Sequence, residues 1–423
     1  MVRLKEHKHS TESKPIERLI ALPKVYIPLQ QHIGKLCEPE VKPGDSVLIG
    51  QRIASVKVHV FANIHASVSG KVMAIQEWPH PVLGRSKTIV IENDGQEKTV
   101  GFSIRSEAQS EALSTDQIRS LIFDAGVVGM GGASFPTHIK LNPPKPVDTL
   151  IVNGAECEPY LTGDYRLMVE HADEILKGIR LAAKCLKVAD IIIAIEDNKP
   201  EAIREFRAKS AGIKVKVLPS TYPQGGEKQL IRRLLDKEIP RGKLPFDVGV
   251  VVHNVATVYA IYEAVYKNKP LYERVVTVTG GLIAKPKNLL VRIGTPINEL
   301  IEYCSGSKSD MAKIISGGPM MGLAQYSMDA PVIKSTNGVL CLSKDEVKRF
   351  EESPCIRCGA CIKECPAGLM PTMISLNSKK EIWQLAKSYG ALDCIECGIC
   401  SYVCPSRIRL VESIKKAKLE VAR

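Results

Sequence analysis

Two runs of cysteines near the end of the chain share one spacing. They are Cys355-x2-Cys358-x2-Cys361-x3-Cys365-Pro and Cys394-x2-Cys397-x2-Cys400-x3-Cys404-Pro. In such a run three thiolates hold three corners of one iron–sulfur cube, and the fourth cysteine reaches the neighbouring cube. The spacing predicts two [4Fe-4S] clusters: the first on Cys355, Cys358, Cys361 and Cys404, and the second on Cys394, Cys397, Cys400 and Cys365.

Zinc is the alternative metal for clustered thiolates. Structural zinc sites usually combine two separated C-x2-C pairs rather than four cysteines in one run, so the spacing favours iron–sulfur clusters. Between the two runs, Ile382, Leu385, Ala386 and Tyr389 recur at helical spacing, which predicts a helical ferredoxin-type module. Such a module carries single electrons and therefore needs a redox partner at each end.

A glycine-rich stretch, residues 126–140, is the second candidate site. Gly129, Gly131 and Gly132 lack a Cβ atom, so backbone N–H groups there can approach a phosphate or a flat ring, and Lys140 adds a positive charge. The stretch follows a predicted helix rather than a strand, so it is not the usual dinucleotide fingerprint. Taken alone, it is equally compatible with a flexible loop.

The elements around this stretch alternate between strand and helix. Apolar runs predict strands at 148–152, 190–195, 213–218 and 248–252. Amphipathic stretches predict helices at 165–186, 199–209, 226–236 and 255–267. The alternation predicts a doubly wound α/β domain with a mostly parallel sheet, which binds ligands beyond the carboxyl ends of its strands.

Composition and charge limit the remaining possibilities. The chain has 423 residues, 44% hydrophobic and 25% charged, which is the balance of a multidomain globular protein. Its longest apolar runs are far shorter than the roughly 18 to 20 residues that cross a bilayer, and residues 1–14 contain no signal-peptide h-region. We therefore expect no transmembrane segment and a cytoplasmic location. The net charge of +12 predicts anionic partners.

Four motifs in the middle of the chain resemble the NADH-binding flavoprotein of respiratory complex I. They are Gly129-x-Gly-Gly-Ala-x-Phe-Pro-Thr-x-x-Lys140, Val152-Asn-Gly-Ala-Glu-Cys-Glu-Pro159, Tyr222-Pro-Gln-Gly-Gly-Glu227 and Asn254-Val-Ala-Thr257. That flavoprotein carries a single cluster, whereas the paired cysteine runs resemble the related C subunits of the Rnf electron transport complex. This second resemblance covers nearly the whole chain.

Both flanks of the α/β region fit the same resemblance. Short strands and glycine turns at 26–72 resemble the barrel-sandwich hybrid of biotinyl and lipoyl carriers, although Val60 stands near the place of the modified lysine. A docking role is therefore expected for that domain. The β-rich stretch that begins at 274 resembles a β-grasp (SLBB-like) domain, and the pair Met320 and Met321 is expected to serve packing.

The expected domain division follows from these motifs. It comprises an N-terminal tail (1–24), an unmodified barrel-sandwich domain (25–105), an FMN- and NAD-binding α/β domain (110–270), a β-grasp domain (271–345) and a two-cluster ferredoxin-type domain (346–423).

The resemblance also implies site residues. FMN would be held by Gly129, Gly131, Gly132, Lys140, Asn153, Asn254 and Thr257, and NAD would lie near Phe135, Glu158, Tyr222, Glu227 and Phe246. Gly226 stands where complex I has the first of two consecutive glutamates, and Leu141 and Asn142 stand where a further stacking aromatic is expected. Glu156 and Glu158 have a second interpretation as a helix-capping or solvated loop pair.

Flavin and clusters together imply an electron-transfer function, because FMN exchanges two electrons with nicotinamide and one with a cluster. No catalytic acid or base is needed. The resemblance implies a peripheral subunit, on the cytoplasmic face of the cell membrane, of a cation-translocating ferredoxin:NAD oxidoreductase. Its partners would be membrane-embedded subunits, a ferredoxin-accepting iron–sulfur subunit and, indirectly, ferredoxin.

Two other functions are compatible with parts of the sequence. A homologous flavin and iron–sulfur reductase could serve another acceptor, such as a corrinoid or a soluble reductase system. A basic iron–sulfur module could bind nucleic acid, but the chain shows little aromatic interleaving and no nucleic-acid fold, so no nucleic-acid partner is expected.

Overall fold

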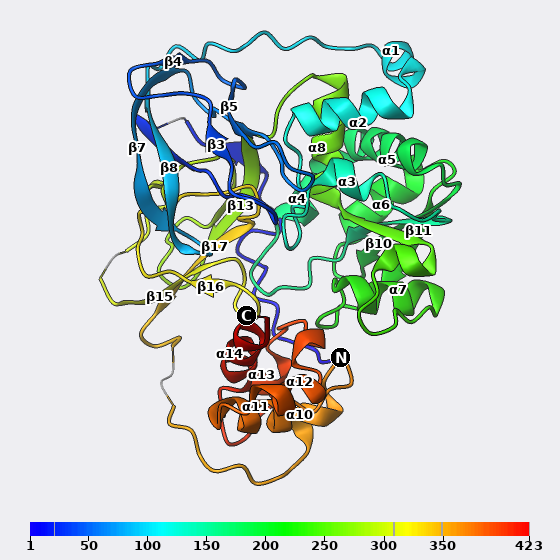
Figure 1. The fold of residues 1–423 in the computed structure, drawn as a ribbon, viewed down its shortest axis with the longest axis vertical. Coiled ribbons are helices and arrows are strands. Elements are labelled where there is room, and N and C mark those ends of the chain that lie inside the picture. The colour runs from blue at the N-terminus through cyan, green and yellow to red at the C-terminus, as the bar shows by residue number, and fades with distance from the viewer. Residues whose placement is uncertain (21, 308, 348–349, 423) are drawn as a thin grey trace.

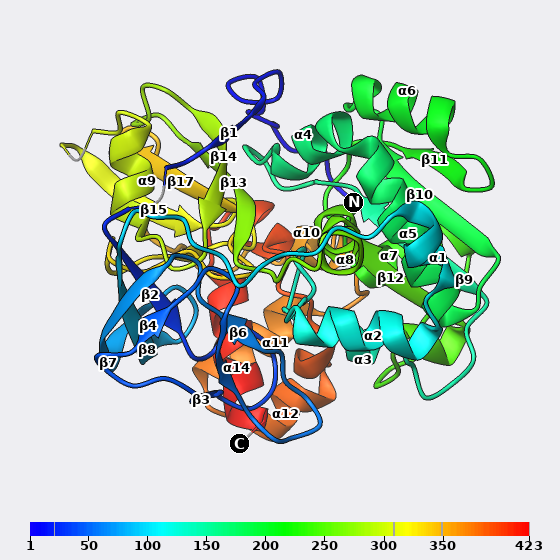
Figure 2. The same ribbon diagram turned by 90° about the horizontal axis from the view of Figure 1, so that it is seen from above.

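The computed structural model describes residues 1–20, 22–307, 309–347 and 350–422. Figure 1 shows two β-rich units on one side, an α/β unit on the other, and a helical unit below them. In the view from above in Figure 2, the two β-rich units lie on the left, the α/β unit lies on the right, and the helical unit lies behind them. No helix in the described ranges is long and apolar enough to span a membrane.

The first β-rich unit is built from two small sheets that enclose one apolar core. The larger sheet has the order β2 (Lys24–Pro28), β8 (Gly84–Asn93), β7 (Gly70–His80) and β4 (Ser46–Val47). The smaller sheet has the order β3 (Glu38–Pro39), β5 (Arg52–Ser55) and β6 (Ile64–His65). Alternating buried residues such as Val25 and Ile27, or Ile89 and Ile91, form the core because successive side chains point to opposite faces.

The α/β unit contains a four-stranded parallel sheet, as predicted. Its order is β11 (Lys214–Leu218), β10 (Asp190–Glu196), β9 (Thr149–Gly154) and β12 (Val250–Asn254). The chain moves outward from β9 through β10 to β11 and then returns to the other side of β9. Strand order therefore reverses between β9 and β12, and open α/β sheets bind ligands at such a switch point.

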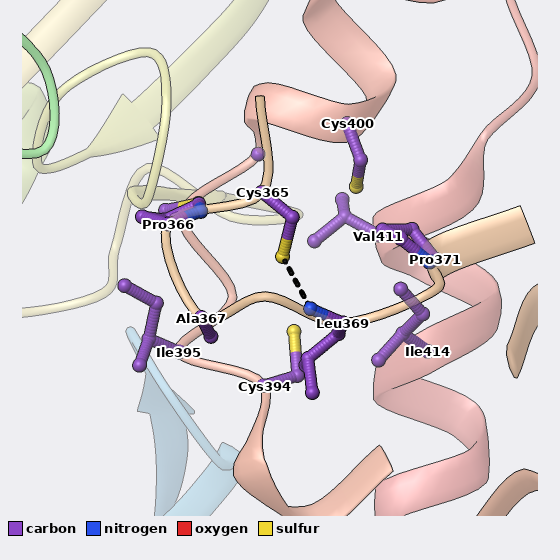
Figure 3. Close-up of a pocket in the computed structure, with 12 residues that line it drawn as sticks. Cys365, Pro366, Ala367, Leu369, Pro371, Cys394, Ile395, Cys400, Val411 and Ile414 are labelled. Atoms are coloured by element: carbon purple, nitrogen blue, oxygen red, sulfur yellow. Dashed lines mark hydrogen bonds between the residues drawn. The ribbon is translucent and has the colours of Figure 1, made fainter. Parts of the chain in front are cut away.

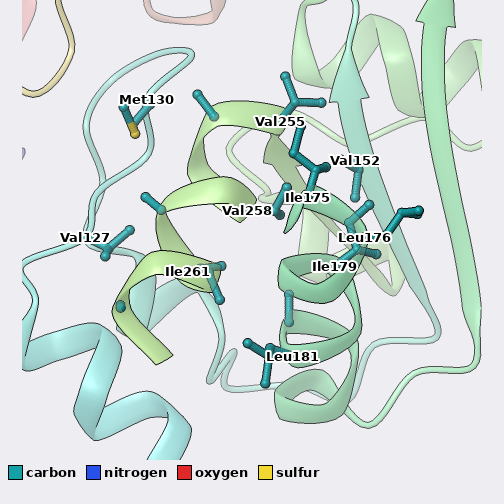
Figure 4. Packing of buried hydrophobic residues seen from close by; sticks show 14 of the residues in the cluster. Val127, Met130, Val152, Ile175, Leu176, Ile179, Leu181, Val255, Val258 and Ile261 are labelled. Atoms are coloured by element: carbon teal, nitrogen blue, oxygen red, sulfur yellow. The ribbon is translucent and has the colours of Figure 1, made fainter. Parts of the chain in front are cut away.

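Helices cover both faces of this sheet. One face packs against helices α2 (Thr115–Asp124), α5 (Ala172–Leu186), α6 (Pro200–Lys209) and α8 (Val255–Tyr266). Figure 4 shows apolar side chains of α5 and α8 in this packing. The other face packs against α7 (Glu227–Leu235). The remaining helices of the unit are α1 (Glu107–Ala112), α3 (Thr137–Lys140) and α4 (Gly163–Glu170).

The second β-rich unit is a six-stranded sheet with one short helix, α9 (Ile297–Tyr303). Its order is β1 (Ile16–Arg18), β14 (Lys287–Arg292), β13 (Glu273–Thr279), β17 (Gly338–Ser343), β15 (Met311–Ser316) and β16 (Leu323–Ala324). Strand β1 comes from the expected N-terminal tail and pairs in parallel with β14. Residues 1–20 are therefore not a loose tail, because part of this segment completes a sheet.

The C-terminal unit is helical, as the spacing between the cysteine runs predicts. It comprises α10 (Ala360–Lys363), α11 (Pro371–Lys379), α12 (Trp383–Ser388), α13 (Ile399–Tyr402) and α14 (Leu410–Ala422). Helices α11, α12 and α14 share a small core that includes Ile374, Ala386 and Ile414. Cysteines of both runs lie at the border of this core.

Candidate redox centre

Two asparagines mark the switch point of the parallel sheet. Asn153 lies at the end of β9, Asn254 ends β12, and the two residues are direct partners in the strand register. The Asn153 amide donates to the Gly225 carbonyl at 2.9 Å and accepts from the Ala155 N–H. These bonds hold the loop that carries Tyr222 and Glu227 against the end of β9.

Asn254 fixes the other side of the switch point. Its side-chain oxygen accepts from the Ala256 N–H at 2.8 Å and so caps α8, while its amide donates to Asp164 at 2.6 Å. Burial raises the pKa of Asp164, and the Asn254 hydrogen bond opposes this rise. The amide is therefore held in one orientation at the carboxyl edge of the sheet.

The glycine-rich loop lies against this edge. The Met130 N–H donates to Thr257 Oγ1 at 2.9 Å, which ties the loop to the first turn of α8. A Cβ atom on Gly131 would lie 2.8 Å from Asn254 Nδ2, so only glycine permits this approach. A Cβ atom on Gly132 would meet nothing within 4 Å. The loop is thus packed at Gly131 and open at Gly132, which fits a flat ligand lying on its backbone.

Lys140 supplies the positive charge of the site. Its Nζ lies 2.7 Å from Glu227 Oε1, and both side chains are partly exposed. Burial, and then the Lys140 charge, lower the pKa of His253 well below its usual value. Lys140 therefore stands at the sheet edge, where it can exchange its carboxylate partner for a phosphate.

The structure gathers the residues predicted for FMN around the switch point. The glycine loop, Asn254 and Thr257 are in direct contact, and Asn153 is the register neighbour of Asn254. Lys140 follows on α3. Phe135, which is half-buried, lies in the same loop, with its carbonyl accepting from the Gly129 N–H at 2.9 Å. These residues fit a flavin phosphate and ring.

Two residues predicted for NAD have other partners in the structure. The Glu158 carboxylate accepts from the Met321 N–H at 2.7 Å and the Met320 N–H at 3.1 Å, in the loop between β15 and β16. Tyr222 is 1% exposed and donates its hydroxyl to the Cys397 carbonyl at 2.8 Å. Burial and the Glu158 charge raise the pKa of Tyr222. Both side chains therefore join the α/β unit to its neighbours.

The structure does not bring Phe246 to the site. Phe246 lies on the short 3-10 helix η1 (Pro245–Val248), which precedes β12, whereas the flavin residues follow the strands. Its neighbour Asp247 pairs with Lys145 at 2.5 Å, on the segment that leads into β9. Since strand β12 separates η1 from Asn254, Phe246 is at the opposite edge of the sheet, and we remove it from the expected NAD residues.

Glu156 has the capping role that was its second interpretation. Its carboxylate accepts from the Asp164 N–H at 2.9 Å and the Tyr165 N–H at 3.2 Å, both in the first turn of α4. A carboxylate at this position satisfies free N–H groups and the positive end of the helix dipole. Glu156 therefore stabilises the loop that follows β9.

The second cysteine run surrounds a cavity. Cys394, Cys397 and Cys400 line it together with Cys365 of the first run, and Leu369, Val411 and Ile414 complete an apolar wall. In Figure 3 the sulfur atoms of Cys365, Cys394 and Cys400 point toward the enclosed space. Burial raises the pKa of Cys397 to about 11 and of Cys400 to about 12. Four thiols around a cavity with an apolar wall fit a [4Fe-4S] cube.

The four cysteines predicted for the first cluster are more exposed than those predicted for the second. Cys355 and Cys358 are exposed, and Cys361 and Cys404 are partly buried. Burial raises the pKa of Cys361, and the nearby Cys404 and Cys355 thiols raise it further. These three cysteines therefore lie together, as the predicted pairing requires, while Cys358 lies on the exposed side.

Both runs have the same backbone conformation. Arg357 and Glu396 have φ of 58°, and Gly359 and Gly398 have φ of 76° and 79°. These left-handed positions curl each run into a loop before a single helical turn.

In the described ranges no three His, Cys, Asp or Glu side chains converge closely enough to hold one metal ion. The thiols of the second run surround a cavity instead.

The sequence did not reveal one buried residue beside the switch point of the parallel sheet. Lys8 is buried, and its ammonium contacts the turn that contains Glu156 and Glu158. A single lysine in a basic N-terminal segment has no local pattern that distinguishes it from a solvated side chain. These two partners lie 148 and 150 residues further along the chain, so no local signal could have revealed the contact.

Family models match four consecutive parts of the chain. They are the RnfC barrel sandwich hybrid domain (residues 2–96), the Nuo51 FMN-binding domain (122–263), the SLBB domain (275–324) and the 4Fe-4S dicluster domain (351–408). They confirm the predicted fold class, an FMN-binding domain and a two-cluster domain.

Whole-chain relatives extend this result. The chain is 49% identical over 98% of its length to the C subunit of the proton-translocating ferredoxin:NAD(+) oxidoreductase complex of Clostridium ljungdahlii, covering 92% of that protein. It is 46% identical over 94% of its length to the C subunit of the Na(+)-translocating complex of Acetobacterium woodii, covering 90% of it. An NAD+-reducing [NiFe]-hydrogenase shares the fold at a TM-score of 0.50, with 18% identity over 73% of this chain and 63% of its own. The chain therefore belongs to the family of C subunits of the ion-translocating ferredoxin:NAD(+) oxidoreductase complexes, the Rnf complexes.

Proposed function

We propose that this chain passes electrons between NAD(H), an FMN at the switch point and two [4Fe-4S] clusters. It acts as the peripheral subunit, on the cytoplasmic face, of a membrane-bound, cation-translocating ferredoxin:NAD oxidoreductase. Bound FMN would supply the exchange between two-electron and one-electron transfer. The protein contributes binding, alignment and the exclusion of water.

One hydrogen bond carries this proposal. Tyr222 belongs to a nucleotide-site motif, and its hydroxyl donates to the Cys397 carbonyl at 2.8 Å. Cys397, Ile399, Tyr222, Cys157 and Met320 share one apolar cluster. The second cysteine run thus packs directly against the loop that carries Tyr222. Electrons can move between the two sites without crossing solvent.

The proposed roles of the residues follow from their positions. The open backbone at Gly129, Gly131 and Gly132 receives the flavin, and Lys140 binds its phosphate. Asn153, Asn254 and Thr257 hold the loops that form the pocket walls. NADH stacks near Phe135, and Glu227 lies close to its nicotinamide nucleotide. Glu158 and Tyr222 keep the neighbouring units in place.

The units named from the sequence remain the proposed functional division, except at the N-terminus. Residues 25–105 form the docking domain, and residues 110–270 bind FMN and NAD. Residues 271–345 connect the flavin domain to the cluster domain, and residues 346–423 hold the clusters. The partners we propose are membrane-embedded subunits and an iron–sulfur subunit that accepts electrons from ferredoxin. Parts of residues 1–24 belong to the units that they contact.

An anaerobic NADH titration of the purified, FMN-supplemented chain tests the function. Flavin absorbance and electron paramagnetic resonance are recorded together. We expect the flavin to bleach first and the reduced-cluster signals to grow afterwards. If both cofactors are present and NADH reduces neither, NAD is not the electron donor, and a reductase that serves another redox pair becomes the better description.

A further inference from the structure

The first twelve residues cross the loops of the proposed nucleotide site. Val2 and Tyr222 exchange two backbone hydrogen bonds, at 3.1 and 2.8 Å. The Glu6 carbonyl accepts from the Tyr160 N–H at 2.8 Å, and the His7 ring stacks on Tyr160 with centroids 4.6 Å apart. In Figure 1 this blue segment begins beside the C-terminal helices and runs upward between the units.

Lys8 is the buried charged residue of this segment. It is 6% exposed. Its Nζ donates to the carbonyl oxygens of Glu156 at 2.7 Å, Glu158 at 2.9 Å and Leu161 at 2.5 Å. An ammonium group has three N–H bonds, so each bond has one acceptor and none is left over.

The three carbonyls belong to a turn that lacks regular secondary structure. Residues 155–162 connect β9 to α4 and include no helix or strand. Buried carbonyls in such a turn need donors from elsewhere in the chain. Lys8 supplies them from inside the turn, while Glu158 is held by Met320 and Met321 from outside. The conformation of the turn thus depends on contacts from two distant segments.

Buried charges of both signs surround Lys8. Glu196 lies nearby and pairs with buried Lys199 at 2.5 Å. Burial and the Lys199 charge lower the pKa of Lys8, whereas Glu156 and Glu196 oppose that change. Buried Asp164 and Arg274 lie in the same region. Lys8 therefore completes a compact group of buried charges beneath the carboxyl edge.

We propose that Lys8 is a positioning residue of the nucleotide site, and that the N-terminal segment is an integral part of that site; this inference rests on the proposed function. Lys8 holds the 156–161 turn, which follows directly from Asn153 at the switch point. Without the ammonium, the turn loses its internal donor, and the wall of the ligand pocket becomes mobile. Lys8 acts through this turn and needs no contact with FMN or NADH.

The test compares Lys8→Met with Lys14→Met in the full-length chain. Lys14 follows this segment, and its Nζ donates to the Pro286 carbonyl at 2.9 Å, away from the turn, so it is a matched control for charge and side-chain length. FMN and NADH affinities are measured by fluorescence titration. Amide hydrogen exchange of residues 155–162 is the readout that does not depend on ligand.

We expect Lys8→Met to weaken FMN or NADH binding at least tenfold and to accelerate exchange in the turn, while Lys14→Met changes affinity less than twofold. Normal affinity for both ligands in Lys8→Met overturns the inference, whatever the exchange shows. If Lys8→Met does not fold, Lys8→Gln, which keeps two N–H donors, is judged by the same affinity criterion. A wild-type chain that binds neither ligand would instead remove the proposed function.

Discussion

Single side chains at the carboxyl edge carry most of the chemistry that the chain itself supplies. Lys140 is notable because its partner, Glu227, is also a proposed ligand-binding residue, and the two lie 2.7 Å apart. An anionic phosphate that approaches Lys140 competes with this carboxylate. If Lys140 binds the FMN phosphate as proposed, the Lys140–Glu227 pair must open when the phosphate binds.

Lys140→Ala is expected to weaken FMN binding about 10- to 100-fold, since a hydrogen bond to a charged group contributes roughly 1.5–3 kcal/mol. Fluorescence titration of the apoprotein measures the change. Lys145→Ala is the matched control. Lys145 lies before β9, at the opposite edge of the sheet, and its side chain pairs with Asp247. Equal affinities of the two variants would contradict the phosphate role of Lys140.

Cysteine variants in the two runs are expected to behave alike in iron content and differently in stability. Cys358→Ala and Cys400→Ala should each lose one cube, or about half of the iron. Cys358 is exposed, whereas Cys400 is 7% exposed and borders the helical core. We therefore expect a larger fall in melting temperature for Cys400→Ala. Cys304→Ala, outside both runs, is the control, and full iron content in either cluster variant would refute its ligand assignment.

The sequence predicts some of these residues well because the relevant spacing is local. Each cysteine run forms its loop within about a dozen residues, so local spacing indicates three ligands of each cluster, and the fourth ligand comes from the other run. The partners of Glu158 and Tyr222 lie 162 and 175 residues away along the chain. No spacing in the sequence encodes such contacts. The resemblance to the complex I flavoprotein implies that both side chains lie near NAD, and the structure adds their contacts at the junction between units.

Among the elements, the strands of the parallel sheet were predictable and β1 was not. The four sheet strands are apolar runs between helical stretches, and their observed bounds lie within about two residues of those expected. Strand β1 has three residues, Ile16–Arg18, with no alternation to identify it. It is defined by its register with β14, where Ile16 pairs with Asn288.

Strand β1 also contributes to a buried charge group. Arg18 contacts Glu273 at 2.9 Å, and Lys269 and Arg292 contact the same carboxylate at 2.7 and 3.5 Å. Burial alone would raise the pKa of Glu273, but Lys269 and Arg292 hold it at about 2. Its pKa is thus below that of the unfolded chain. The resulting stabilisation is complete above about pH 4.5 and is lost as pH falls toward 2.

Glu273→Gln is expected to lower the free energy of unfolding by roughly 1.5–3 kcal/mol at pH 7, because Lys269 and Arg292 lose the carboxylate that they share. Lys269 still pairs with Glu263, and Arg292 still pairs with Glu97. The difference from the wild type should shrink between pH 4.5 and the lowest pH at which the protein folds. Urea unfolding at several pH values measures it. Glu17→Gln, which breaks the more exposed pair with Lys287, should cost less than about 1 kcal/mol. A pH-independent difference for Glu273→Gln would be inconsistent with the lowered pKa.

At the scale of the whole molecule, Lys334 joins three units. It belongs to the second β-rich unit, yet its Nζ donates to the Asn63 carbonyl of the first β-rich unit and to the Gly126 carbonyl of the α/β unit, both at 2.6 Å. A Cβ atom on Gly126 would lie 2.2 Å from the Asn63 oxygen, so glycine is required there. Burial lowers the pKa of Lys334 from 10.5 to about 7.

This junction predicts a pH dependence of stability. Between about pH 7 and 10.5 the unfolded chain keeps a proton on Lys334 that the folded chain releases, so the contribution of this residue to stability rises with pH. The wild type should therefore gain stability relative to Lys334→Met between about pH 6.5 and 9, by at most about 1.4 kcal/mol per pH unit. Chemical denaturation of both proteins at the two pH values measures the gain. An exposed substitution, Lys344→Met, should show no such trend.

The unequal exposure of the two cysteine runs has a practical consequence for handling the protein in air. Dioxygen attacks the clusters that it can reach, and Cys355 and Cys358 lie at the surface, whereas Cys397 and Cys400 are enclosed. Aerobic purification should therefore remove the outer cube first and leave the inner one beside Tyr222. In a preparation with half its iron, NADH would still reduce the inner cube, yet no electron would pass onward to a partner.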